Sequence, residues 1–193
     1  MVGKSLSLII VTLVIATTTL AQSNNAPVRD TKGHPIQRGK EYYIKPAITD
    51  SGGPLTLVSR NKPCPLYVGQ ENSDASKGLP VIFTPFEKND DVVKVNRDFK
   101  IAFAAASVCV QSTEWKLDEK DPKSGRRLIG TGNGSYFRII ETQFEGIYNI
   151  RWCPTDVCPF CKFNCGTAGG LRENGKILFA LDGNVLPVVF ERA

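Results

Sequence analysis

The sequence predicts an all-β protein. Short runs rich in Val, Ile, Phe and Tyr recur along the chain, with Gly, Pro, Asn and Asp between them. No segment keeps an apolar stripe at helical spacing for three turns. The runs follow one another at intervals close to the roughly 8–12 residues that are typical of sandwiches and barrels. Apolar residues make up 41% of the chain and charged residues 22%, values that exclude wholesale disorder.

The predicted strands of the first half each centre on aromatic or β-branched residues, which favour extended backbone. The first contains a Tyr-Tyr-Ile core, and the second follows a Gly-Gly-Pro turn signal. In chain order we expect strands over 41–45, 55–58, 66–68, 80–83, 92–95 and 99–103, with a further one at Val110.

The second half continues the same pattern, and its first strand, 114–117, alternates polar and apolar residues. The expected strands are 114–117, 127–129, 136–140, 147–152, 176–179 and 188–190. About twelve strands divide into three units of four strands with roughly 57 residues each, within the range of internal repeats. This arithmetic favours a β-trefoil over a sandwich, although no repeat is visible by identity.

Residues 1–21 have the features of a secretory signal peptide. Lys4 precedes an apolar run over 6–16, and small residues stand at Thr19 and Ala21. The run is shorter than a membrane span of about 20 residues, and no second one follows. An uncleaved signal anchor is the alternative. We therefore expect removal of 1–21, a single domain over 22–193, no membrane span, and secretion to the extracellular space or delivery to the vacuole.

The charges and the lone histidine exclude several classes of function. The chain has 24 Lys plus Arg and 19 Asp plus Glu, a net charge of +5, and its nearest basic patch, 123–127, lacks interleaved aromatic residues. We expect no nucleic-acid partner. His34 alone could serve a nucleophilic site or a metal, and its sequence context predicts a surface turn. The carboxylate pairs 90–91 and 118–119 suit a solvated loop better than a glycosidase. We expect no enzyme and no cofactor.

Six cysteines in a secreted chain predict disulfides. Four of them cluster, with a C-x₄-C-x₂-C spacing that iron–sulfur proteins also use. An oxidising compartment argues against such a cluster and against structural zinc, so we expect no metal. Six cysteines allow 15 connectivities. We favour Cys64–Cys109, with two nested bridges, Cys153–Cys165 and Cys158–Cys161.

One N-glycosylation sequon occurs, at Asn133-Gly-Ser135. It lies in the glycine-rich stretch 130–134, which reads as an exposed loop. We expect Asn133 to be accessible for glycosylation.

Several motifs, in order and at matching spacing, resemble plant Kunitz-type (soybean trypsin inhibitor-like) proteins. They are Asp30-Thr-Lys-Gly33, 39–44, 52–53, Cys64-Pro-Leu, 78–83, 110–117, Cys153-Pro-Thr, Cys158-x-x-Cys161 and 175–181. The last group and the six-cysteine layout are most similar to the miraculin-like branch. The resemblance implies a β-trefoil, that is, a pseudo-threefold barrel with a hairpin cap, and the same disulfide pairing. We expect a monomer, because no cysteine is left to link subunits.

The resemblance also implies inhibition of serine endopeptidases by an exposed, substrate-like loop that the barrel holds rigid. In this family the loop follows the strand after the first cysteine, which here places it at 84–91. Its candidate members are Pro85, Phe86, Glu87, Lys88, Asn89 and Asp90. The target would be a trypsin- or subtilisin-like enzyme, or a protease of another class.

Two counts disagree on which of these side chains enters the primary pocket of the protease. Counting forward from Pro85-Phe86 gives Glu87, and counting back from 99–103 gives Asn89, with Lys88 between them. Lys88 would suit the acidic pocket of a trypsin-like enzyme, whereas Glu87 would face a like charge there.

This chain also differs from the family at the residue behind the loop. Trypsin-inhibiting members usually carry an Asn there, and its amide braces the loop; this chain has Arg38. A guanidinium only donates hydrogen bonds and cannot reproduce both halves of an amide brace. We therefore expect a less rigid loop. The alternative function is a non-inhibitory, miraculin-like defence or binding protein on the same scaffold.

Overall fold

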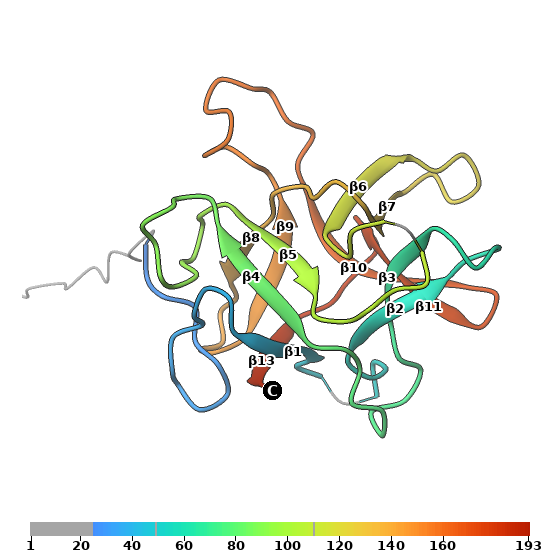
Figure 1. Cartoon of the computed structure of the whole chain (residues 1–193), viewed down its shortest axis with the longest axis horizontal. Coiled ribbons are helices and arrows are strands. Elements are labelled where there is room, and N and C mark those ends of the chain that lie inside the picture. The colour runs from blue at the N-terminus through green and yellow to red at the C-terminus, as the bar shows by residue number, and fades with distance from the viewer. Residues whose placement is uncertain (1–24, 49, 110) are drawn as a thin grey trace, which may run out of the picture.

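The computed structural model describes residues 25–48, 50–109 and 111–193 (Figure 1). The predicted signal peptide and the strand expected at Val110 lie outside this part of the chain. The described residues form 13 strands and no helix, so no helix in them could cross a membrane. The strands are β1 (Glu41–Pro46), β2 (Leu55–Ser59), β3 (Leu66–Gln70), β4 (Val81–Pro85), β5 (Phe99–Phe103), β6 (Trp115–Lys120), β7 (Arg127–Thr131), β8 (Arg138–Glu141), β9 (Tyr148–Trp152), β10 (Gly166–Glu173), β11 (Lys176–Leu181), β12 (Asn184–Val185) and β13 (Val188–Arg192).

Six strands close into a barrel. Antiparallel pairs link β1 to β4, β4 to β5, β8 to β9, β9 to β13 and β13 back to β1. The remaining gap, between β5 and β8, is closed by a bridge in which Phe99 and Phe137 exchange backbone hydrogen bonds of 3.0 and 2.8 Å. Closure leaves this ring without a free edge strand.

Three hairpins cap the barrel. They are β2–β3, β6–β7 and β10–β11, and β3, β7 and β11 also pair with one another. Each third of the chain therefore contributes two barrel strands and one hairpin. This arrangement is a β-trefoil, which confirms the fold class predicted from strand spacing.

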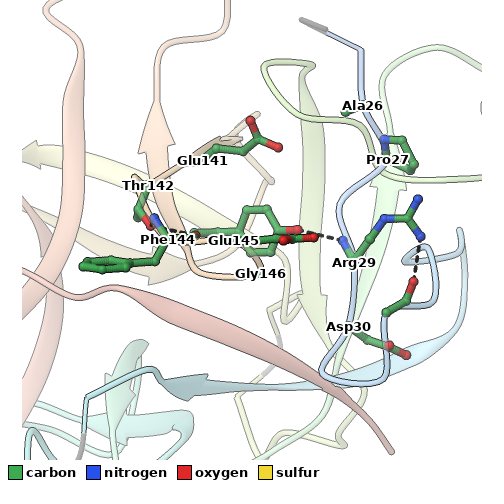
Figure 2. Close-up of a pocket in the computed structure, with 11 residues that line it drawn as sticks. Ala26, Pro27, Arg29, Asp30, Glu141, Thr142, Phe144, Glu145 and Gly146 are labelled. Atoms are coloured by element: carbon green, nitrogen blue, oxygen red, sulfur yellow. Dashed lines mark hydrogen bonds between the residues drawn. The ribbon is translucent and has the colours of Figure 1, made fainter. Parts of the chain in front are cut away.

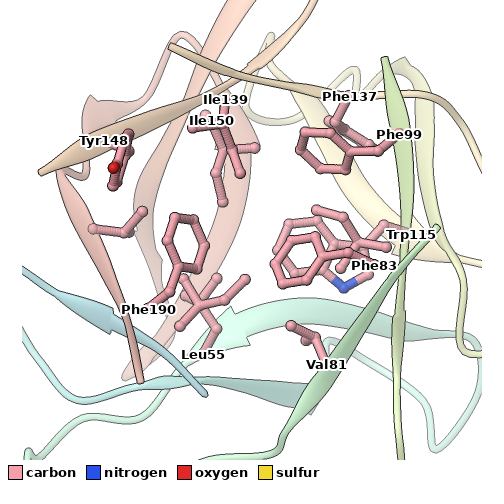
Figure 3. Close-up of a cluster of buried hydrophobic side chains, with 14 of the residues drawn as sticks. Leu55, Val81, Phe83, Phe99, Trp115, Phe137, Ile139, Tyr148, Ile150 and Phe190 are labelled. Carbon is pink, nitrogen blue, oxygen red and sulfur yellow. The ribbon is translucent and has the colours of Figure 1, made fainter. Parts of the chain in front are cut away.

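Aromatic side chains fill the barrel (Figure 3). Phe83 has edge contacts with Tyr42, Phe99 and Phe190 at centroid distances of 5.6–6.2 Å. Trp115 is fully buried and is the centre of a second group. Complete burial of such a side chain contributes about 1.5–3 kcal/mol. Along each barrel strand, buried side chains alternate with more exposed ones, and the buried ones point into the barrel.

The structure contradicts the strand prediction at three places. β10 was not expected, because glycines at 166, 169 and 170 are unfavourable for strands. Close backbone contact explains them: a Cβ on Gly169 would lie 2.0 Å from the Asn184 carbonyl oxygen. Segment 92–95 is not a strand and makes only isolated bridges to the N-terminal segment. The short β12 is the third difference, and it pairs with β10.

Three disulfides cross-link the chain, with the pairing that the resemblance implies. Cys64–Cys109 joins residues 45 apart, and Cys153–Cys165 and Cys158–Cys161 lie nested between β9 and β10. We call residues 153–165 the disulfide loop. No described cysteine is free.

An ion cluster ties together the outer ends of the three cap hairpins. Arg60 follows β2, Asp121 lies in the β6–β7 turn, and Glu173 ends β10. The Arg60 guanidinium lies 2.6 Å from Asp121 and 2.8 Å from Glu173, and all three side chains are only 11–13% exposed. Its hydrogen bonds hold the pKa of both carboxyls below their ordinary values, and Lys123 adds to the effect on Glu173.

This cluster predicts loss of stability in acid. Because the folded-state pKa values are lowered, its contribution is complete above about pH 5 and is lost as the pH falls below about 4. We expect about 2 kcal/mol of unfolding free energy to disappear there, measured by urea unfolding between pH 7 and pH 2.5. Asp121→Asn should flatten the profile, and Asp74→Asn, at an exposed carboxylate outside the cluster, should leave it steep. An equal slope in wild type and Asp121→Asn would contradict this assignment.

Candidate functional site

The candidate loop connects β4 to β5, two adjacent barrel strands. Its first two predicted members are anchors: Pro85 is buried at the end of β4, and the half-buried Phe86 packs edge-on against Tyr136, with ring centroids 5.4 Å apart. The Phe86 N–H also donates to the Asp98 carbonyl, at 2.8 Å. Pro85 and Phe86 thus lie at the base of the loop, and the exposed tip begins at Glu87.

The tip of the loop is a turn. The Asp90 N–H donates to the Glu87 carbonyl at 3.1 Å, which places Lys88 and Asn89 at the two central positions, both exposed. The extended segment expected from the resemblance is not present here. A hydrogen-bonded turn takes the place of an extended stretch.

The charges at the tip are unequally paired. Glu87 faces Arg97 at 3.4 Å, and Asp90 faces Lys94 at 2.6 Å. Among the described residues, no carboxylate lies within ion-pair distance of the Lys88 ammonium. Of the three candidates between which the sequence counts were divided, Lys88 is therefore the one that presents an uncompensated charge to the solvent.

Arg38 supports the turn from behind, and in this respect the structure differs from the expectation of a poorly braced loop. Its backbone N–H donates to the Asp91 carbonyl at 2.8 Å. Its guanidinium donates to four loop carbonyls, those of Glu87 (2.6 Å), Asp90 (2.9 Å), Lys88 (3.2 Å) and Pro85 (3.5 Å). A donor-only guanidinium suffices here, because the loop groups that face it are carbonyl oxygens, which only accept.

The base of the loop rests on a buried carboxylate, which the sequence analysis did not single out. The Asp98 side chain is fully buried, and it accepts hydrogen bonds from Arg138 Nε and from the N–H groups of Asp156 (2.7 Å) and Val157 (3.0 Å). The Asp98 N–H donates in return to the Asp156 carboxylate at 2.8 Å. The base of the loop and the start of the disulfide loop thus share one polar network.

Other predicted positions lie apart from this loop. His34 is in an exposed turn, and its backbone N–H donates a hydrogen bond to the Asp30 carboxylate at 2.9 Å. Asn133 is exposed in the connection between β7 and β8, as expected for a glycosylation acceptor. Within the part of the chain that the structure describes, no group of three or more His, Cys, Asp and Glu side chains is arranged to hold a metal.

A pocket of about 360 Å³ lies between the N-terminal segment and the β8–β9 turn (Figure 2). Arg29 lines one side, and Phe144 and Glu145 line the other. The Tyr148 hydroxyl accepts a hydrogen bond from the Arg29 N–H at 3.0 Å, and burial raises its pKa. None of the residues that line the pocket belongs to 84–91, so the pocket is separate from the candidate loop.

The core of this β-trefoil is filled, so its surface loops carry the chemistry available to a partner, and among them is the braced turn between β4 and β5. The chain belongs to the legume Kunitz family of trypsin and protease inhibitors, whose model matches residues 28–192.

Named relatives place the chain within this family. It is 58% identical to Kunitz type trypsin inhibitor 106 of Medicago truncatula over 192 residues, which cover 94% of this chain and 92% of the relative. Miraculin of Synsepalum dulcificum is more distant, at 34% identity over 89% of this chain and 84% of its own. The solved rice bifunctional α-amylase/subtilisin inhibitor superposes with a TM-score of 0.71 at 34% identity, over 88% of this chain and 99% of its own. Trypsin inhibitors are thus nearer relatives than miraculin.

Proposed function

We propose that this protein inhibits serine endopeptidases and that Lys88 is the side chain that enters the primary pocket of the target. The observation that carries the proposal is the exposed Lys88 ammonium at the tip of a braced turn, which has no carboxylate within ion-pair distance among the described residues. The buried acid of a trypsin-like pocket complements this charge. Family membership and the name of the Medicago relative support the same class of target.

The turn sets one requirement for this mechanism. A protease cleft binds an extended segment, so docking has to open the 3.1 Å hydrogen bond from Asp90 to Glu87. Arg38 holds both of these residues by their carbonyls, and it can keep them in place while the turn opens. An inhibitor of this kind binds tightly because its held loop loses little entropy on binding. It is a poor substrate because the loop does not move away after attack. It performs no catalysis of its own.

Lys88→Ala tests the proposal. Against trypsin we expect the inhibition constant to rise at least about tenfold, because a pocket acid loses its charged partner. Lys77→Ala, at an exposed lysine in another loop, should behave as wild type. The panel should include chymotrypsin, subtilisin and a cysteine protease. A wild type that inhibits none of them excludes the inhibitor function for those targets, and equal inhibition by Lys88→Ala would show that another residue sets specificity.

Removal of the Arg38 brace should weaken inhibition without affecting the fold. Arg38→Ala deletes the hydrogen bonds from Nε and Nη2 to the loop carbonyls. We expect the inhibition constant to rise about tenfold and cleavage after Lys88 to become faster. Timed digestion with a catalytic amount of trypsin, followed by mass spectrometry, measures the cleavage. Arg38→Lys should fall in between, because one ammonium cannot span the same carbonyls. Lys40→Ala, at an exposed neighbour, is the control, and a loop equally resistant in all variants would rule out a bracing role.

The second candidate function, a non-inhibitory binding protein, is favoured by one observation. The hydrogen-bonded turn at 87–90 is not the extended shape of a protease substrate. Stable binding of trypsin without occupation of its active site would identify this function, whereas inhibition that Lys88→Ala abolishes would exclude it.

We further propose that the protein is a secreted monomer that loses residues 1–21 and carries a glycan on Asn133. Three disulfides suit an oxidising compartment, and the Asn133 side chain is exposed. The intact mass of the protein purified from its native tissue, before and after removal of N-glycans, tests the cleavage and the glycan together.

A further inference from the structure

The disulfide loop carries an exposed apolar tip. Figure 1 shows the connection between β9 and β10 projecting well beyond the strands. At its tip Val157 is 42% exposed and Phe160 is 95% exposed, and the intervening Pro159 is exposed as well. Apolar residues gathered in this way mark interaction sites more often than single exposed ones do.

Both ends of this loop are held, so the tip is rigidly presented. At the start, the buried Asp98 carboxylate binds the N–H groups of Asp156 and Val157. At the end, Arg127 Nη2 donates to the Asn164 carbonyl at 2.6 Å. Between these anchors the Cys158–Cys161 bridge and a 3.2 Å backbone hydrogen bond close a tight turn around Phe160. A contact made by such a tip costs little ordering entropy.

The disulfide loop lies beside the turn that carries Lys88. One side chain demonstrates this: the Arg97 guanidinium is 3.4 Å from the Glu87 carboxylate and 3.1 Å from the Asp156 carboxylate. Glu87 is the immediate neighbour of Lys88, and Asp156 is the immediate neighbour of Val157. The two projecting segments therefore form one continuous surface.

The size of a protease footprint extends over both segments. A stable complex buries about 800 Å² on each partner, which corresponds to a disc of roughly 16 Å radius. Because the Arg97 ion pairs join Glu87 to Asp156, we expect a footprint of this size centred on Lys88 to include part of the disulfide loop. We propose that the tip of the disulfide loop, Val157, Pro159 and Phe160, is a second contact surface that binds an apolar patch beside the cleft of the same serine endopeptidase. This inference rests on the proposed inhibition through Lys88 and assigns it a further anchor.

Phe160→Ala tests this second contact against the protease that wild type inhibits. We expect about a tenfold rise in the inhibition constant, mostly through faster dissociation. Phe160→Leu should keep most of the affinity because the contact is apolar, and Phe160→Asp should lose more than Phe160→Ala. Phe144→Ala is the matched control, since this aromatic residue is 59% exposed in the turn at the other end of the β8–β9 hairpin. All four variants should unfold at the wild-type temperature.

The outcomes separate this inference from the proposed function. If Lys88→Ala loses inhibition while Phe160→Ala and Phe160→Asp match wild type, the proposed function stands and the second contact is refuted. If wild type inhibits no protease of the panel, the proposed function fails and the second contact fails with it. A weakening by Phe144→Ala equal to that by Phe160→Ala would also overturn the inference, because the effect would then not be specific to the disulfide loop.

Discussion

Asp98→Ala should destabilise the protein by about 3–5 kcal/mol, the range for removing one partner of a buried ion pair. The substitution leaves the guanidinium of Arg138, whose side chain is only 14% exposed, without its main partner, and it frees the N–H groups of Asp156 and Val157 inside the protein. Arg138 keeps only an ion-pair contact to Asp156 at 3.0 Å. Urea unfolding of the disulfide-intact protein measures the change.

Two comparisons make this prediction specific. Asp98→Asn keeps the shape and one acceptor, so it should cost less than Asp98→Ala. Asp74→Ala, at an exposed aspartate, should change the unfolding free energy by less than about 0.5 kcal/mol. The Asp98 backbone carbonyl, which accepts the Phe86 N–H at the base of the loop, is unchanged by the substitution. We therefore expect Asp98→Ala to raise the inhibition constant by less than its loss of unfolding free energy would suggest. A loss below about 1 kcal/mol for Asp98→Ala would show that the network is not a significant source of stability.

Replacement of Cys64 and Cys109 by Ser should cost about 4 kcal/mol. In the chain-entropy model, the cost follows the length of the closed loop, and this bridge joins residues 45 apart. Replacement of Cys158 and Cys161, which are only three residues apart, should cost about 2 kcal/mol by the same relation. Urea unfolding of the two double variants beside wild type measures both values. A larger loss from the short bridge than from the long one would contradict the entropic account.

For inhibition, we expect the opposite order of effects from the two bridges to that expected for stability. Cys158–Cys161 closes the turn that presents Phe160, whereas Cys64–Cys109 joins the segment before β3 to the segment after β5. Inhibition should therefore be more sensitive to the loss of the short bridge, measured under conditions in which both variants are fully folded.

Most of the fold could be predicted from local patterns. Runs such as 41–45 and 99–103 alternate as barrel strands do, and they are barrel strands with one buried face. The failures share one cause. β10 is rich in glycine because neighbouring backbone approaches it closely, and 92–95 alternates because Val93 and Val95 are buried under the N-terminal segment. In both cases the burial comes from contacts with distant parts of the chain.

The candidate site was less predictable than the fold. The resemblance located the loop between β4 and β5, but counts along the chain could not choose among Glu87, Lys88 and Asn89. The choice rests on Arg97 and Lys94, which pair with the acids on either side of Lys88. The four-residue spacing of Asp90 and Lys94 indicates a pair only in a helix, and nothing local indicated that Arg97 also reaches Asp156.

By itself, the sequence determined the all-β class, the approximate threefold division of the strands and the chemistry available to the loop. These properties depend on residue type and short-range periodicity, which any reader of the chain can see. Only the tertiary structure decided that Arg38 braces the turn as a donor, that Asp98 joins the loop to the disulfide loop, and that Phe160 stands exposed beside the same surface. The hydrogen bonds behind the first two features join groups 49 to 58 positions apart in the chain, and the closed barrel brings such groups within hydrogen-bond distance.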